Sequence, residues 1–349
     1  MNHDLPMLMP GDKFTPQTDP IYAITCVSNF EGWASRARTH QRFAEAFARH
    51  PGFHLITVEV VVGDRKFEVT DASNPDHVQF RVNQDYHFFG KEGYLNAGIR
   101  TNLTRRFPAW RKLMWIDADV MHVRADLADA VSRELDHENI CATHTQSADL
   151  GAHHEIIANE GGEILDRSFG AACVVGDAHV PGVESYHRQK AGRVVQQHYG
   201  YAGAIRRETY DAIGGFPDRI VTGAGDYHLW LAAAGLEVED DKDLSPGYNR
   251  YVREITALFD RTVKGRIGAV RGQLLHFYHG KKAQRQYRSR RSIIVDSQFD
   301  PYTDVIYDAH GLPFVSVPDS KRARAFHRGM RTYLSGVNAD FHTNEAKDQ

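Results

Sequence analysis

The sequence has few cysteines, no long apolar run and no excess of charge of either sign. Its three cysteines, Cys26, Cys141 and Cys173, stand apart in apolar surroundings and form no Cys-x-x-Cys pair. This pattern excludes a disulfide framework. We expect three reduced, buried thiols, as in a cytosolic protein.

Membrane and secretion signals are also missing. No stretch approaches the roughly 18 consecutive apolar residues of a membrane span. The first residues, MNHDLPMLMPGDKF, place Asp and Pro where a signal peptide needs an apolar core. We therefore expect a soluble, cytoplasmic protein.

The charge balance is close to neutral, with 42 Lys and Arg against 45 Asp and Glu and a formal net charge of −3. The whole protein therefore has no general attraction to nucleic acid or membrane, and such affinity would need a local patch. With 42% hydrophobic residues, the 349-residue chain can build a sizeable core in one large or two modest domains.

Apolar runs alternate with helical patterns over the first third of the chain. Strands are expected at 21–29, 54–63 and 112–117. Helices are expected between them, at 32–50 and 91–107. This order predicts an α/β fold with a mostly parallel sheet, whose ligands lie beyond the carboxyl ends of the strands.

The second half of the chain has weaker patterns. A short strand is expected at 171–176, a helix at 225–236 and another strand at 273–280. The segment 149–163 is rich in Gly and His and is expected to be a mobile loop. The run KKAQRQYRSRR at 281–291 predicts a strongly basic helix.

Two aspartates, Asp117 and Asp119, follow the strand predicted at 112–117 in the motif WIDADV. An Asp-x-Asp at a strand end suits a hard divalent cation such as Mg²⁺ or Mn²⁺, which prefers oxygen ligands. The plain alternative is that two polar residues simply close the strand. The motif by itself does not decide between them.

A second candidate is the pair His276 and His279 in LHFYHG. On a regular strand these side chains point to opposite faces, so that one of them could be a ligand. A bend at the strand end would bring both to one ion. Imidazole beside carboxylate favours Mn²⁺ over Mg²⁺. The alternative is an aromatic edge with surface histidines.

The motif GAGDYH supplies a third candidate. Gly223 and Gly225 permit close backbone approach, and Asp226 opens a predicted helix. As an N-cap, Asp226 would contribute only about 1 kcal/mol of stability. At the mouth of a glycine-lined pocket it would be a general base. Both interpretations stay open on this motif.

Four motifs in order resemble a metal-dependent glycosyltransferase of the GT-A fold. The resemblance is to the β-1,4-galactosyltransferase group and the related polypeptide N-acetylgalactosaminyltransferases. It rests on FFGKEGYLNAGI (88–99), WIDADV (115–120), the stretch 201–230 and LHFYHG (275–280). It implies a GT-A domain over 21–292, with an N-terminal arm at 1–20 and a basic C-terminal extension at 293–349.

The resemblance also implies roles for single residues. Asp119 would bind the metal as the second aspartate, with His279 and His276 as further ligands. Asp117 would contact the nucleotide or the donor sugar, and Asp226 would supply the catalytic base. The remaining expected donor contacts are Thr25, Val27, Asn29, Lys91, Asn96, Gly203, Gly225 and Arg285.

The activity implied is hexosyl transfer from a nucleotide-diphosphate sugar, a UDP-sugar by expectation, with Mn²⁺ or Mg²⁺. A single base opposite the leaving group implies inversion. The sequence departs from the family's pattern: the G-G-E-D-D-D cluster is reduced to GAGDYH, so the base assignment rests on Asp226 alone, and the tryptophan that precedes these glycines is absent.

The acceptor stays open between a hydroxymethylated base in phage DNA and a glycan or protein, in a bacterial or phage-infected cell. The basic stretches 281–291 and 321–331 allow DNA, because phosphate contacts need only a local patch. A metal-dependent phosphohydrolase is the second interpretation, since Asp-x-Asp and His-x-x-His also suit phosphate esters. A non-catalytic nucleotide-binding protein is the third.

Overall fold

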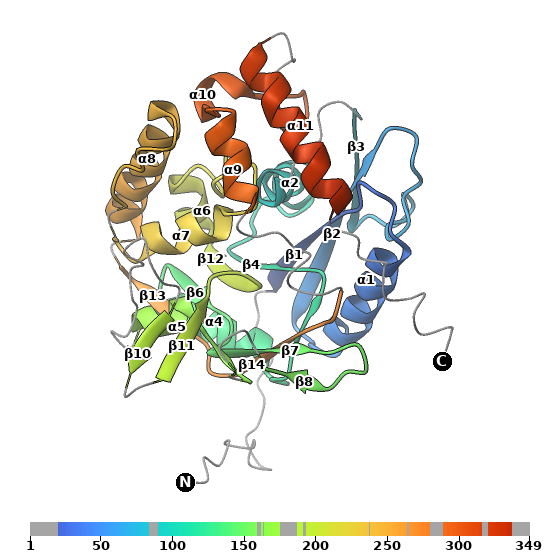
Figure 1. Cartoon of the computed structure of the whole chain (residues 1–349). Helices are drawn as coiled ribbons and strands as arrows, with labels where there is room; N and C mark the ends of the chain where they lie inside the picture. The colour runs from blue at the N-terminus through green and yellow to red at the C-terminus, as the bar shows by residue number, and fades with distance from the viewer. Residues whose placement is uncertain are drawn as a thin grey trace, which may run out of the picture.

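The computed structural model places two seven-stranded sheets and their helices in one layered arrangement (Figure 1). The residues it describes are 20–83, 90–158, 162, 164–174, 187–190, 193–236, 238–263, 265–279, 289–315 and 320–336.

The central sheet is mostly parallel. Its strands, in spatial order, are β13 (Ile267–Ala269), β6 (Ile140–Ala142), β12 (Ala202–Arg206), β4 (Lys112–Ile116), β1 (Ile21–Ser28), β2 (Phe53–Val62) and β3 (His77–Val82). Strand β12 runs antiparallel to its neighbours β4 and β6, and the other pairs are parallel. The expected α/β class, with a mostly parallel sheet flanked by helices, is confirmed.

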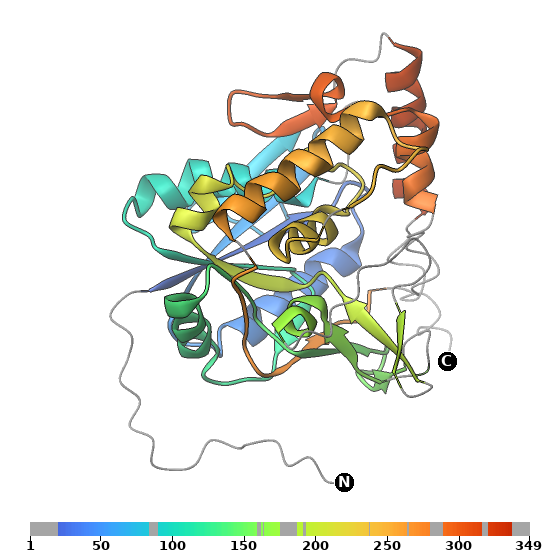
Figure 2. The ribbon, with the colours of Figure 1, turned by 90° about the vertical axis from the view of Figure 1, so that its left-hand side faces the viewer.

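Helices cover both faces of this sheet (Figure 2). They are α1 (Ala34–Phe47), α2 (Lys91–Gly98), α3 (Thr104–Arg106), α4 (Leu127–His137), α5 (Phe169–Val174), α6 (Arg207–Ala212), α7 (Gly225–Ala233), α8 (Pro246–Thr262), α9 (Ser289–Asp296), α10 (Pro301–Asp304) and α11 (Lys321–Gly336). A π-helical turn, Ile99–Leu103, joins α2 to α3, so the helix predicted at 91–107 is present with a local widening.

Strand β1 is buried on both faces, and this explains why its sequence is apolar at almost every position. Tyr22 and Ile24 belong to one buried cluster, whereas Ile21 and Ala23 belong to another on the opposite face. Successive strand residues point to opposite faces, and both faces here are covered by helices. A strand buried on both sides reads as a continuous apolar run.

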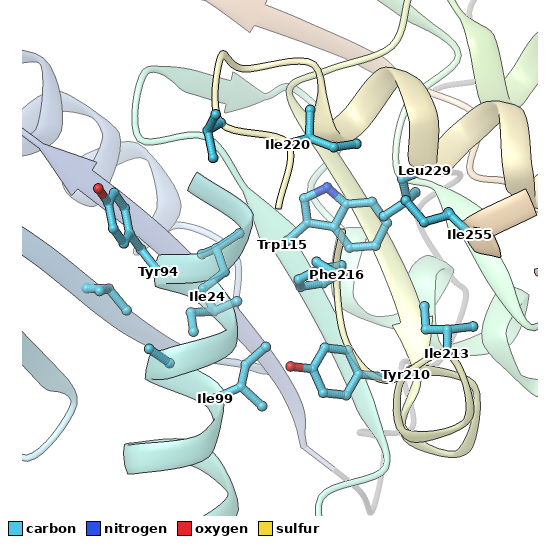
Figure 3. Close-up of a cluster of buried hydrophobic side chains, with 14 of the residues drawn as sticks. Ile24, Tyr94, Ile99, Trp115, Tyr210, Ile213, Phe216, Ile220, Leu229 and Ile255 are labelled. Atoms are coloured by element: carbon cyan, nitrogen blue, oxygen red, sulfur yellow. The ribbon is translucent and has the colours of Figure 1, made fainter. Parts of the chain in front are cut away.

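The larger cluster is built around Trp115 of β4 (Figure 3). Its ring lies 5.1 Å from the ring of Phe216 and 6.0 Å from that of Trp230. Gly203 on β12 pairs with Trp115, and a Cβ at Gly203 would lie 2.2 Å from the indole. This glycine therefore makes room for the indole inside the sheet.

The second sheet lies beside the carboxyl end of β4. Its strands, in order, are β10 (His187–Lys190), β11 (Arg193–His198), β9 (Asp166–Ser168), β7 (Gln146–Leu150), β14 (Gln273–His276) and β5 (Val120–His122), with β8 (Ile156–Ile157) paired to β7. One expectation changes here. The segment 149–163, which was predicted to be a mobile loop, contains the end of β7 and all of β8.

The strand predicted at 171–176 is wrong over 171–174, because Phe169–Val174 is helix α5, and residues 175 and 176 lie outside the described residues. Its Ala171 and Ala172 favour a helix, and Gly170 allows a close approach to Trp230. The apolar character that suggested a strand instead reflects burial of a short helix.

The described helices α9 and α11, at the C-terminal end of the chain, pack on the main body. Ile293 of α9 and Phe326 and Met330 of α11 belong to the same cluster as Trp115. Helices α9 and α11 lie side by side in Figures 1 and 2. A two-stranded sheet, β15 (Val305–Tyr307) and β16 (Pro313–Val315), lies between them in sequence. The boundary at residue 292 stays a prediction.

Three buried histidines form a group beneath the second sheet. The ring centroids of His122 and His144 lie 6.0 Å apart, and those of His50 and His122 lie 6.5 Å apart. Neither ring nitrogen of His144 has a hydrogen-bond partner. Burial, together with nearby imidazoles, lowers the pKa of His144 to about 3 and holds the pKa of His122 well below its usual range.

This group predicts a loss of stability in mild acid. Below about pH 6.5 the unfolded chain takes up protons that the folded histidines exclude, and each excluded proton costs about 1.4 kcal/mol per pH unit. The contribution is fully present above that pH. Urea unfolding at pH 7.5, 6 and 5 should show the decline. His144→Phe should make the free energy of unfolding less dependent on pH, because unfolding then takes up one proton fewer. Exposed His137→Gln is the control. Equal slopes for wild type and His144→Phe would contradict this account.

Candidate functional site

A pocket opens at the carboxyl ends of β1 and β4, where an α/β sheet places its ligands. Its lining residues are Cys26, Val27, Ser28, Arg36, Thr39, Lys91, Asp117, Ala118, Asp119 and His279. They come from β1, α1, the start of α2, the turn after β4 and the segment after β14. The pocket thus joins the two sheets.

Three predicted metal ligands meet at this pocket. The Asp119 Oδ2 atom lies 3.1 Å from His279 Nε2 and 3.9 Å from His276 Nε2. The two Nε2 atoms are 3.1 Å apart. One ligand atom from each of the three residues lies within 4.8 Å of the others, as one ion requires. A carboxylate and two imidazoles suit Mn²⁺.

Strand pairing explains how residues so distant in sequence meet. Strand β14 runs antiparallel to β5, with His276 opposite Val120, and Phe277 N–H donates to the Asp119 carbonyl at 2.8 Å. The strand ends at His276, and the chain then turns so that His279 returns to the same side. The bend considered from the sequence is therefore present, and both imidazoles face Asp119.

Asp149 was not predicted as a site residue, yet it orients His276. The two residues are paired in register on the parallel strands β7 and β14. Nδ1 of His276 lies 2.8 Å from Oδ1 of Asp149, and both side chains are buried. An Nδ1–H donated to Asp149 leaves Nε2 of His276 unprotonated toward Asp119, which is the tautomer a metal ligand needs.

The two aspartates of WIDADV have different partners. Oδ1 of Asp117 lies 2.8 Å from Lys91 Nζ, while Asp119 faces the histidines. Burial opposes ionisation of Asp119, but the neighbouring imidazoles of His276 and His279 hold its pKa well below the usual range. Burial, only partly offset by Lys91, raises the pKa of Asp117.

Asp226 lies near this ion pair. Helix α7 begins at Gly225 after the N-cap Ala224, so Asp226 is not the N-cap and that interpretation of the motif does not hold. Its Oδ1 accepts from Tyr227 N–H at 2.8 Å. Burial by itself would lower the pKa of Lys91. The electrostatic attraction of nearby carboxylates, Asp226 among them, outweighs this effect and raises the pKa above its usual range. The predicted base thus faces the predicted donor contacts.

Of the other predicted donor contacts, Val27 and Lys91 line the pocket. Three more are described residues outside its lining. Thr25 is fully buried in β1, Gly203 packs against Trp115, and Gly225 starts α7. Arg285 lies outside the described residues.

Two asparagines have structural partners instead. Asn29 bonds the backbone of Trp33 in both directions, at 2.9 and 3.0 Å, which closes the turn after β1. Asn96 bonds the backbone of Phe216 in both directions at 2.9 Å and also accepts from Tyr210 Oη. Its side chain ties α2 to the loop after α6, away from the pocket lining.

Arg36 and Thr39 of α1, with Ser28, are pocket residues that sequence reasoning missed. Only their position in the sequence could have indicated these residues. Ser28 ends the first strand, and Arg36 and Thr39 lie in the helix that follows it, which borders the ligand edge of a parallel sheet. A helical pattern alone does not indicate which of its polar residues face a pocket.

No family model and no curated protein matches this sequence. Among solved structures, the chain is similar to a mannosyltransferase from Pyrobaculum calidifontis in complex with GDP-Man and Mn²⁺, with 15% identity, TM-score 0.42, and coverage of 95% of this chain and 76% of that one. It is also similar to a 4-diphosphocytidyl-2C-methyl-D-erythritol synthase from Anaerococcus prevotii, with 12% identity, TM-score 0.32, and coverage of 73% and 89%. These likenesses are too low to identify a reaction.

Among the residues that the structure describes, no helix has both the length and the apolar character to cross a membrane.

The contact between Asp149 and His276 predicts a metal-affinity effect. Asp149→Asn should weaken Mn²⁺ binding about ten- to hundredfold, because the amide holds the imidazole less firmly in the ligating tautomer. Isothermal titration with Mn²⁺ measures this. Asp136→Asn, which removes an exposed carboxylate beside Lys112, is the matched control and should bind as wild type. Equal affinities for Asp149→Asn and wild type would show that Asp149 has no such role.

Proposed function

We propose that this protein is a metal-dependent, inverting glycosyltransferase that moves a sugar from a nucleotide-diphosphate donor, a UDP-sugar by preference, to an acceptor hydroxyl. The observation that carries the proposal is the meeting of Asp119, His276 and His279 beside the Lys91–Asp117 pair. Asp117 and Asp119 follow the end of β4 in the mostly parallel sheet, and such strand ends are where α/β folds bind nucleotides.

Asp119, His276 and His279 would hold Mn²⁺, or Mg²⁺ with less preference for the imidazoles. Three protein ligands leave positions open for substrate oxygens. When bound, the ion supplies a positive charge that stabilises the negative charge developing on the departing nucleotide diphosphate. The buried contact with Asp149 keeps His276 in the form that such an ion needs.

The donor contacts follow from the charges around the pocket. Lys91 is held positive by the neighbouring carboxylates and places that charge at the pocket wall. Asp117 accepts from Lys91 through Oδ1, and its Oδ2 would accept from a ribose or sugar hydroxyl. Arg36 of α1 also lines the pocket and would add a second cation for a diphosphate.

Asp226 would take the proton from the acceptor hydroxyl as its oxygen attacks the anomeric carbon. The bond to the diphosphate oxygen breaks as the new glycosidic bond forms. Because the single base and the leaving group lie on opposite sides of the sugar, the anomeric configuration inverts. The first turn of α7 favours a negative side chain, which suits a residue that must act as a carboxylate.

The base assignment predicts a clean loss of turnover. Asp226→Asn should lower kcat about 10²- to 10⁴-fold, because the amide cannot accept the proton, while UDP binding with Mn²⁺ stays nearly intact. Mass spectrometry of products from a panel of nucleotide sugars, with and without Mn²⁺, measures transfer. Exposed Asp211→Asn is the control. Full activity of Asp226→Asn would place the base elsewhere.

The same assay separates the competing interpretations. Release of phosphate without free sugar or glycosylated product would favour the phosphohydrolase. Binding of nucleotide without any turnover, whether Mn²⁺ is present or removed, would favour a binding protein.

Helix α11 supports a polyanionic acceptor such as DNA carrying hydroxymethylated bases. Lys321, Arg324, Arg328 and Arg331 are exposed at intervals of three and four residues, which places them on one face of the helix. No acidic residue occurs in Lys321–Gly336. A row of cations on one helix face suits contacts to successive phosphates. Glycans and proteins remain the alternative acceptors.

Replacing Arg328 and Arg331 by Ala should weaken binding to duplex DNA and reduce its salt dependence by about two released counterions, since each phosphate contact contributes nearly one. Fluorescence anisotropy across a salt series measures this. UDP binding with Mn²⁺ should be unchanged in the same variant. Absence of duplex binding by the wild type at low salt would exclude DNA as the acceptor.

A further inference from the structure

Glu92, the second residue of α2, is a buried carboxyl with no assigned role. It is 5% exposed, and its Oε2 atom is buried without a hydrogen-bond partner. Elsewhere the chain satisfies such a group. Glu59 is equally buried and accepts hydrogen bonds from the backbone of Glu68 and Thr70 at 2.7 and 2.9 Å. Buried carboxyls without partners are rare and costly, so Glu92 needs an explanation.

The carboxyl of Glu92 packs directly against the start of α7. A Cβ at Gly225 would lie 2.3 Å from its carboxyl carbon and 2.6 Å from each of its oxygens. Only glycine at 225 leaves room for this contact. Since Asp226 follows immediately, α2 presents one carboxyl to the backbone that carries the proposed base.

Four ionisable groups surround Glu92. Lys91 precedes it, Asp226 lies on α7, Asp117 follows β4, and the Cys26 thiol lies on β1. Burial, with repulsion from Asp226 and Asp117 and against attraction by Lys91, raises the pKa of Glu92 to about 7. A group in this position can change charge within the ordinary working range of an enzyme.

We propose that Glu92 is a positioning residue of the transfer site, a neutral carboxylic acid whose packing on Gly225 fixes the first turn of α7, the turn that carries Asp226. This inference rests on the proposed glycosyl transfer. The motif GAGDYH carries a single acid, and the structure brings a second carboxyl, from α2, against the glycine that precedes it.

Charge explains why the neutral form matters. Asp117 and Asp119 already line the pocket, and Asp226 acts on Lys91 beside it, before an anionic diphosphate enters. An ionised Glu92 adds a negative charge in a poorly solvated place, where repulsion is weakly screened. Loss of its proton therefore opposes donor binding. A pair of nearby carboxyls with separated protonation states is also the arrangement from which acid and base roles are built.

The test is Glu92→Gln, which keeps the shape and cannot ionise. In wild type, the KM for donor and the Kd for UDP with Mn²⁺ should rise above pH 7, approaching tenfold per pH unit, the limit for one proton. In Glu92→Gln both should stay flat to pH 8.5. Exposed Glu45→Gln should keep the wild-type profile. Identical profiles for wild type and Glu92→Gln would overturn the proposal.

Infrared difference spectroscopy gives a readout that needs no turnover. The wild type at pH 6 should show a buried carboxylic-acid carbonyl band that disappears by pH 8.5 and is absent from Glu92→Gln. Its absence from the wild type at pH 6 would overturn the proposal. If no nucleotide sugar is turned over, the proposed function fails, while the infrared and UDP measurements still decide the state of Glu92. Circular dichroism confirms that each variant folds.

Discussion

The pairing of β14 with β5 on one side and β7 on the other is the interaction on which the site depends. It places His276 between Asp119 and Asp149, and the 2.8 Å bond from Phe277 N–H to the Asp119 carbonyl fixes the point at which the strand ends. Backbone hydrogen bonds thus set the separation of three side chains that the sequence keeps far apart. A one-residue slip would turn His276 away from both carboxylates.

The central sheet provides the edge at which Lys91 meets Asp117. Lys91 reaches that edge because α2 begins there, and α2 is held by the bonds of Asn96 to the backbone of Phe216. The buried packing of Trp115 against Gly203 fixes the strand that ends at Asp117. Residues away from the pocket thereby control where its charges stand, which is how preorganised sites keep their electrostatics.

The sequence predicted the features that depend on local pattern. Apolar runs indicated β1, β2 and β4, and parallel topology alone placed Asp117 and Asp119 at the ligand edge. Features that depend on pairing between distant segments were missed. Asp149 looked like the start of a loop because nothing local shows its register with His276. The resemblance placed Asn96 and Gly203 at the donor, yet the structure uses both for packing. Helix α5 was mistaken for a strand because a short buried apolar run has no distinguishing period.

The five carboxyl groups at the site have different contacts, and we assign each of them a different role. Asp119 faces imidazoles, Asp149 holds one of them, and Asp117 meets Lys91. Asp226 lies at a helix start, where a negative charge is favoured, while Glu92 packs against that start with its Oε2 atom buried and without a hydrogen-bond partner. Chemically similar groups become distinct only through what they contact. The contact between the Glu92 carboxyl and the start of α7 therefore depends on the absence of a side chain at Gly225.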